Sequence, residues 1–94
     1  MDTRIAYVDS DDRITRAALS KAERAAVIGI RATHIEQGAP PLVPTTANDT
    51  ALAIATREAD ACLIPVKIRR NVGRGVYELW TFKELATGYA EIKK

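Results

Sequence analysis

The sequence has little of the chemistry on which small catalytic or metal-binding domains usually depend. Its 94 residues include one cysteine, Cys62, and one histidine, His34. A single cysteine excludes an internal disulfide and a cysteine-based zinc site, and any nucleophile–histidine centre would have to use that one imidazole. No apolar run approaches the roughly 18 residues of a membrane-spanning helix, and the N-terminus shows no signal-peptide pattern. We therefore expect a reduced, intracellular protein.

The apolar content predicts one small domain with a thin core. The chain lies just below the most common domain size of roughly 100–150 residues. Leu, Ile, Val and Phe number 22, and alanine adds 16 small side chains. Leu, Ile, Val and Phe together make up about 23% of the chain, just above the roughly 20% below which chains tend to stay disordered. A domain of this kind is expected to gain stability from a partner.

Charge is distributed unevenly, although the net charge is only +2. Residues 1–13 carry four aspartates against two arginines, and residues 65–94 carry seven Lys or Arg against three Glu. We predict a flexible acidic tail over residues 1–12 and a folded domain over residues 13–94. A net charge this small does not by itself indicate a protein that binds nucleic acid strongly.

The first predicted helix has a defined start and a defined end. Ser20 and Glu23 form a capping box, in which each side chain accepts a backbone N–H of the first turn. The helix is expected to run to about Gln37, before Gly38. Its predicted apolar stripe consists of Ala25, Ile28, Ala32 and Ile35, widened by Val27 and Ile30.

Two further features of this helix indicate an interface. Lys21, Arg24 and Arg31 project to one side and form a cationic stripe beside the apolar one. Gly29 lies in mid-helix, where glycine costs about 1 kcal/mol relative to alanine. We interpret this glycine as a point that another backbone approaches closely. The alternative interpretation of the cationic stripe is an ordinary charged surface that is exposed to solvent.

The remainder predicts a second helix, a β-hairpin and a short third helix. The second helix is expected to begin at Asn48 or Asp49 and to end near Leu63, before Pro65. Its predicted apolar stripe consists of Leu52, Ala55, Ala59 and Cys62. Residues 64–69 then alternate with period two, residues 71–75 read as a turn, and residues 76–80 as the return strand. A second capping box, Thr81 with Glu84, opens the short helix. The fold class is therefore α+β: two packed helices, a C-terminal β-hairpin and a short helix, preceded by an extended tail.

The residues offer few candidates for chemistry. His34 has no evident nucleophile beside it, and Cys62 reads as a small apolar residue of a helix stripe. The Gly73–Gly75 segment contains no phosphate-loop motif, so a hairpin turn explains it. The basic hairpin, with two aromatic residues among its cations, could contact either nucleic acid or a protein partner.

The order of these motifs resembles one family, the small RNA polymerase subunit shared by the three eukaryotic nuclear polymerases. Archaeal subunit K and, more distantly, bacterial omega belong to the same group. The resemblance extends from residue 13 to about residue 86. The positions that carry it are Arg13–Thr15 and Leu19–Ala32 in the first half, and Leu52–Ala55, Ile64–Pro65, Ile68–Arg70, Gly75, Tyr77–Glu78, Trp80 and Glu84–Leu85 in the second.

The resemblance implies a non-catalytic subunit that binds the C-terminal region of the largest polymerase subunit and promotes its assembly and stability. It implies no metal, cofactor, membrane or small-molecule substrate, and contact with DNA or RNA only indirectly, through the complex. The expected location is with the transcription machinery: the nucleus in a eukaryote, the cytoplasm in an archaeon, or the host nucleus, host cytoplasm or virion for a virus. The expected partner-binding residues are Lys21, Glu23, Arg24, Gly29, Arg31, Arg69, Arg70, Tyr77 and Trp80.

Two other hypotheses stay open at this point. A free-standing nucleic-acid-binding module would use the basic hairpin and bind in a salt-dependent manner, with Arg69 and Arg70 setting that dependence. A small enzyme would depend on His34, but the sequence indicates no substrate pocket.

Overall fold

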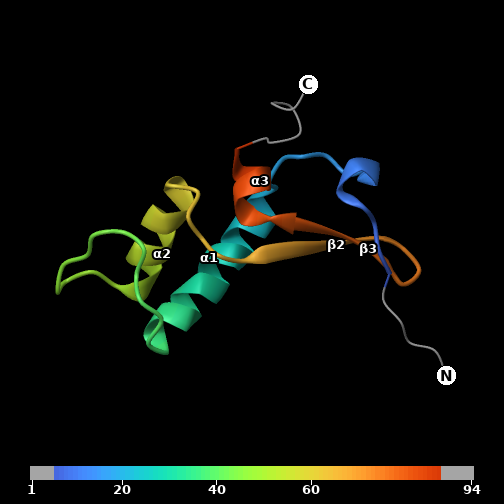
Figure 1. Ribbon diagram of the computed structural model, residues 1–94. Helices are drawn as coiled ribbons and strands as arrows, with labels where there is room; N and C mark the ends of the chain where they lie inside the picture. The colour runs from blue at the N-terminus through green and yellow to red at the C-terminus, as the bar shows by residue number, and fades with distance from the viewer. Residues whose placement is uncertain (1–5, 88–94) are drawn as a thin grey trace.

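The computed structural model describes residues 6–87 and has an α+β architecture, as the sequence predicts (Figure 1). Helices α1 and α2 pack against each other, and a small three-stranded sheet lies beside α1, with α3 at the end of its last strand. None of the helices in these residues is long and apolar enough to cross a membrane. The elements are β1 (Ala6–Tyr7), the 3-10 helix η1 (Ser10–Asp12), α1 (Lys21–Glu36), α2 (Ala51–Asp60), β2 (Lys67–Gly73), β3 (Val76–Thr81) and α3 (Phe82–Ala86).

Helix α1 begins and ends as the sequence predicts. The Ser20 side chain accepts the Glu23 N–H at 3.0 Å, and the Glu23 carboxylate accepts the Ser20 N–H at 3.0 Å, which completes the capping box. Gln37 caps the C-terminal end, and Gly38 follows with a φ of 106°. A positive φ costs glycine little, so this residue turns the chain out of the helix.

The buried face of α1 differs from the predicted stripe. Val27, Arg31 and Ala32 are the buried residues, whereas Ala25 and Ile30 are exposed. The reason is that α2 and the sheet pack on adjacent sides of the helix, so the covered arc extends to Val27 and Arg31, while Ile28 still packs against the core.

Helix α2 is shorter than predicted, and its N-cap is Thr50. The Thr50 hydroxyl accepts the Ala53 N–H at 3.0 Å, while the Asp49 carboxylate instead accepts the Thr46 N–H and pairs with Arg57. The predicted stripe is also shifted. Leu52 is 59% exposed and Cys62 is only half-buried. The buried residues are Ile54, Ala55, Glu58 and Ala59.

The sheet contains one strand more than the predicted hairpin. Strands β2 and β3 pair antiparallel, and β1 pairs parallel with the other edge of β3, so the strand order is β1-β3-β2. The Ala6 N–H donates to the Gly75 carbonyl at 3.0 Å, and the Val8 N–H to the Tyr77 carbonyl at 2.9 Å. Part of the predicted tail is therefore ordered against the hairpin, although Asp9, Asp11 and Asp12 are exposed.

The hairpin turn is tighter than the sequence indicates. Strand β2 continues to Gly73, after an irregularity between Asn71 and Gly73. Arg74 and Gly75 form the turn, and Gly75 has a φ of 70°. Thr81 and Glu84 then form the second predicted capping box, which opens α3. The predicted helix end at Gly88 lies outside the described residues.

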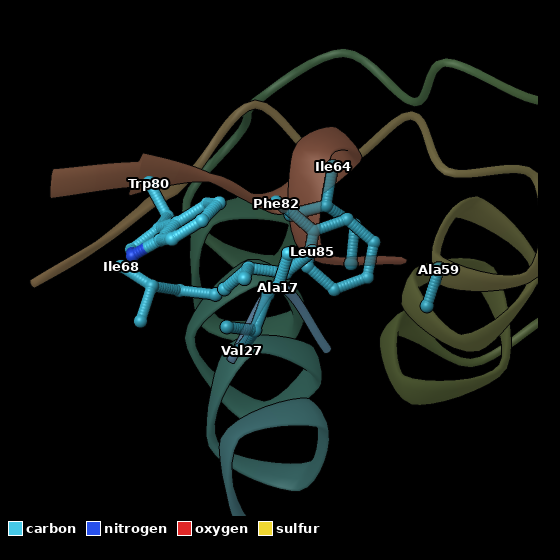
Figure 2. Packing of buried hydrophobic residues seen from close by; sticks show 8 residues of the cluster. All are labelled: Ala17, Val27, Ala59, Ile64, Ile68, Trp80, Phe82 and Leu85. Atoms are coloured by element: carbon cyan, nitrogen blue, oxygen red, sulfur yellow. The ribbon is translucent and has the colours of Figure 1, made fainter. Parts of the chain in front are cut away.

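One small core joins the sheet to all three helices. Figure 2 shows Phe82, Leu85 and Ile64 close together, with Ala59 approaching from α2 and Trp80 beside Ile68. Its buried members are Ala17, Val27, Ala59, Ile64, Ile68, Trp80, Phe82 and Leu85. Two alanines among eight residues agree with the thin core that the composition predicts.

Candidate interaction surfaces

Arg31 lies inside the protein and is fully paired there. Its guanidinium donates to Glu58 twice, from Nε at 2.5 Å and from Nη2 at 3.2 Å, and also to the Pro40 carbonyl at 3.0 Å. The Leu42 N–H donates to the same carboxylate at 2.9 Å. The pair therefore joins α1 to α2 and holds the chain that connects them.

Glu58 remains ionised in this buried position. Burial by itself raises the pKa of Glu58, but the hydrogen bonds from Arg31 and from the Leu42 N–H outweigh it and hold the pKa below its usual value. Sequence reasoning missed this residue. The sequence could have revealed it, because Glu58 precedes Ala59 in an otherwise apolar part of the helix. A carboxylate that is buried there requires a positively charged partner.

Arg70 is likewise satisfied within the chain. Its guanidinium holds Glu23 through two bonds of 2.7 and 2.8 Å and donates to the carbonyls of Arg16 and Ala18 at 2.6 and 2.8 Å. The hydrogen bonds from Arg70 lower the pKa of Glu23 to about 2, against the smaller opposing effect of burial. Both residues were predicted to bind a partner, and here they attach β2 to the start of α1.

Glu78 is a fully buried carboxylate that the sequence analysis did not single out. Its oxygens accept the Ile14 N–H at 2.5 Å, the Thr15 N–H at 3.2 Å, the Thr15 hydroxyl and the Trp80 Nε1–H at 3.0 Å. Burial raises its pKa, but these four donors prevail and the pKa is lowered to about 2. The sequence could have indicated that Glu78 is buried, because the period-two alternation of the strand places it on the same face as Trp80.

Trp80 belongs to the core and not to an exposed surface. The residue is 2% exposed. The Arg13 guanidinium lies 4.0 Å from a Trp80 ring centroid and pairs with Glu84 at 3.2 Å. Residues 13–18 are thus held against the inner face of the sheet by Arg13, Glu78 and Arg70.

Arg24 and Lys21 retain exposed positions on α1. Arg24 pairs with Asp60 at 2.6 Å across the α1–α2 contact, and both side chains are solvent-exposed. Lys21 is exposed at the first turn. The three members of the predicted cationic stripe therefore have different environments. Arg31 is in a buried ion pair, Arg24 is in a surface ion pair, and Lys21 makes no ion pair with the residues that the structure describes.

The outward side of α1 carries no charged side chain from Ala22 to Thr33, which is about three turns of helix. Its exposed residues are small, and Gly29 stands at their centre. A Cβ at Gly29 would meet no atom of the described residues within 4 Å, so the isolated fold does not require glycine there. We call this set the small-residue face of α1. Its members are Ala22, Ala25, Ala26, Gly29 and Thr33.

The outward side of the sheet has a different chemistry. Lys67 and Arg69 are exposed on β2, and the Arg69 guanidinium lies 4.5 Å from the Tyr77 ring centroid. The Tyr7 ring lies 6.3 Å from that of Tyr77. Among the predicted site residues, only Arg69 and Tyr77 share this face. Sequence reasoning missed Tyr7, because nothing in the sequence pairs a two-residue strand with β3.

Neither candidate for catalysis forms a side-chain hydrogen bond or ion pair within residues 6–87. His34 is exposed near the end of α1, and Cys62 follows α2 with a φ of 58°. Within residues 6–87, no group of three or more His, Cys, Asp or Glu side chains could hold a metal ion.

Comparison with known proteins adds the family context. The chain is 38% identical over 78 residues to the fission yeast (Schizosaccharomyces pombe) subunit RPABC2 of DNA-directed RNA polymerases I, II and III, covering 83% of this chain and 55% of that protein. The chain is homologous to these shared polymerase subunits. The corresponding Saccharomyces cerevisiae subunit is 36% identical over 83% of this chain and 50% of its own length, and that of Dictyostelium discoideum is 39% identical over 79% and 56%.

These homologues support the eukaryotic part of the predicted resemblance. Their names are those of subunits shared by three polymerases, which agrees with the expectation of an RNA polymerase subunit. The chain spans about half the length of the curated relatives it matches. No protein-family model matches the sequence.

Proposed function

We propose that this chain is a non-catalytic subunit of a multisubunit DNA-dependent RNA polymerase, and that it binds the largest subunit and promotes its assembly. The homology to RPABC2 over 83% of the chain carries this proposal. Because the reported relatives are eukaryotic, we place the protein with the transcription machinery of a nucleus.

The distribution of polar contacts supports a scaffold that presents preformed surfaces. The ion pairs of Arg31 and Arg70 organise the fold before any partner arrives. A preorganised surface loses less conformational entropy on binding than one that must be ordered.

We assign the contact with the largest subunit to the small-residue face of α1. Small side chains let a second backbone approach closely, and Gly29 permits the closest approach of all. Lys21 borders this face and is exposed, so it is accessible for carboxylates or carbonyls of the partner. Arg24 instead projects towards α2, where it pairs with Asp60. The buried Arg31 contributes by holding α1 against α2.

Co-expression tests the proposal. The tagged chain is produced with the C-terminal segment of the largest polymerase subunit of the same organism and washed at high salt. We expect a stoichiometric complex that Gly29→Leu disrupts, because the new side chain occupies the space intended for the partner. Ala47→Leu, in the exposed connector between α1 and α2, adds the same bulk elsewhere and should leave the complex intact.

Two outcomes would contradict the proposal. The first is the absence of any complex with the wild-type chain. The second is equal loss with Gly29→Leu and Ala47→Leu, which would indicate general misfolding. Arg31→Ala is unsuitable for this experiment, since removing one partner of a buried ion pair destabilises the fold by about 3–5 kcal/mol regardless of binding.

A further inference from the structure

The outward face of the sheet combines two tyrosine rings, one of them exposed, with cations that pair with no carboxylate of residues 6–87. Strand alternation places the side chains of Arg69, Leu79 and Tyr77 on this side, opposite Arg70, Glu78 and Trp80. We call this surface the outer sheet face. Its members are Tyr7, Lys67, Arg69, Tyr77 and Leu79.

Strand β1 builds the aromatic part of this surface. The register pairs Tyr7 with Tyr77, and the two ring centroids lie 6.3 Å apart at an interplanar angle of 45°. Tyr7 is 51% exposed, although a tyrosine could bury much of its ring in a core. The chain therefore orders part of its N-terminal segment and presents an aromatic ring to solvent.

The cations of this face differ from most arginines of residues 6–87, among which only Arg16 and Arg74 share with Arg69 the lack of an ion pair. Five arginines each pair with a carboxylate within 3.2 Å: Arg13, Arg24, Arg31, Arg57 and Arg70. Within residues 6–87, Lys67 and Arg69 make no such ion pair. Arg69 instead lies over the Tyr77 ring, at 4.5 Å from its centroid. These two positive charges remain available for an anion.

We propose that the outer sheet face binds single-stranded nucleic acid. Bases would stack on Tyr7 and on the Arg69–Tyr77 pair, and phosphates would be contacted by Lys67 and Arg69, the combination by which sheet surfaces hold unpaired bases. A duplex hides the faces of its bases, so it could use only the cations. An acidic peptide would match the charge but would leave both rings unused. This inference does not rest on the proposed polymerase role.

Fluorescence anisotropy with the full chain tests the proposal. The probes are a fluorescein-labelled 15-nucleotide oligouridylate, the matching oligothymidylate, and a DNA duplex of the same length, all at low salt. We expect saturable binding of the single strands and at least tenfold weaker binding of the duplex. Tyr7→Leu should weaken single-strand binding about tenfold, whereas Tyr7→Phe, which retains the aromatic face, should preserve it.

Arg69→Ala and Arg16→Ala form the matched charge comparison. Both residues are exposed, but only Arg69 lies on the outer sheet face. Arg69→Ala should reduce the slope of log affinity against log salt by about 0.7, as expected for one lost phosphate contact on a single strand, and Arg16→Ala should not.

Three results would overturn the proposal: no saturable binding by the wild-type chain, equal loss with Arg16→Ala and Arg69→Ala, or complete competition by polyglutamate at equal charge. Circular dichroism of every variant separates lost binding from lost folding. Capture of the largest polymerase subunit by Tyr7→Leu, measured in parallel, keeps the test independent of the assembly proposal.

Discussion

The two faces of the sheet place identical residue types in opposite situations. Arg69 and Arg70 are neighbours in β2, yet Arg70 reaches Glu23 and two backbone carbonyls, whereas Arg69 faces solvent over Tyr77. Likewise Trp80 is enclosed while Tyr77 is half-exposed. The period-two geometry of a strand decides which arginine holds the fold and which is free to bind.

The comparison also explains how a thin core supports a fold. On the inner face, Glu78 and Arg70 together bind four backbone groups of residues 14–18: the N–H groups of Ile14 and Thr15 and the carbonyls of Arg16 and Ala18. In this way polar side chains position a segment whose one large apolar residue, Ile14, is 79% exposed. The outer face makes no comparable contribution to folding.

The largest expected effect is the loss of one partner of the buried pair. Glu58→Ala leaves the Arg31 guanidinium buried without a counter-charge and should destabilise the chain by about 3–5 kcal/mol. Urea denaturation followed by circular dichroism measures this change. The double variant Arg31→Met with Glu58→Leu should recover much of the loss, and a double variant no more stable than Glu58→Ala would contradict this explanation.

Arg69 and Arg70 provide the most direct test of how much each face of the sheet contributes to the free energy of unfolding. Arg70→Ala removes several charge-assisted hydrogen bonds and should lower the free energy of unfolding by about 2–3 kcal/mol. Arg69→Ala should change it by no more than about 0.5 kcal/mol, as for an ordinary surface residue. Equal destabilisation in thermal or urea unfolding would show that the two faces contribute equally to folding.

Acidification should weaken the inner network. Glu23 and Glu78 have pKa values of about 2 in the folded chain against an ordinary value of 4.5. Their contribution is therefore present above pH 4.5 and is lost as the pH falls towards 2, with a slope of up to about 1.4 kcal/mol per pH unit for each carboxylate. Urea titrations across this window measure the slope. Glu78→Gln should reduce it, and an unchanged slope would exclude Glu78 as its source.

The smallest expected effect is that of Gly29→Ala, which should change stability and partner binding in opposite directions. Gly29→Ala places a methyl group in open space on α1 and should stabilise the isolated chain by about 0.5–1 kcal/mol through helix propensity. The same change should weaken capture of the largest polymerase subunit. A gain in melting temperature without any loss of capture would move the proposed contact away from the small-residue face of α1.

Local signals were predictable wherever neighbouring residues carry them. Both capping boxes, the exit from α1 at Gly38 and the hairpin appear in the structure as the sequence predicts. The start of α2 was wrong because Asp49, a good cap by type, is engaged by the Thr46 N–H and by Arg57. Of the predicted partner-binding residues, Arg69 and Tyr77 lie on an accessible face, while Arg31, Arg70 and Trp80 are held in internal contacts. Whether any of the set binds a polymerase subunit stays a prediction.

The sequence by itself determined the class of the fold, the helix starts that carry capping boxes and the likeness to the shared polymerase subunit, since these depend on short-range spacing. Only the tertiary structure decided which charges are structural. Arg31 meets Glu58 across 27 residues and Arg70 meets Glu23 across 47, distances over which no local periodicity operates. The place of Tyr7 beside Tyr77 has the same origin: strand pairing depends on which edge of β3 is left open, and that is settled only when the whole chain has folded.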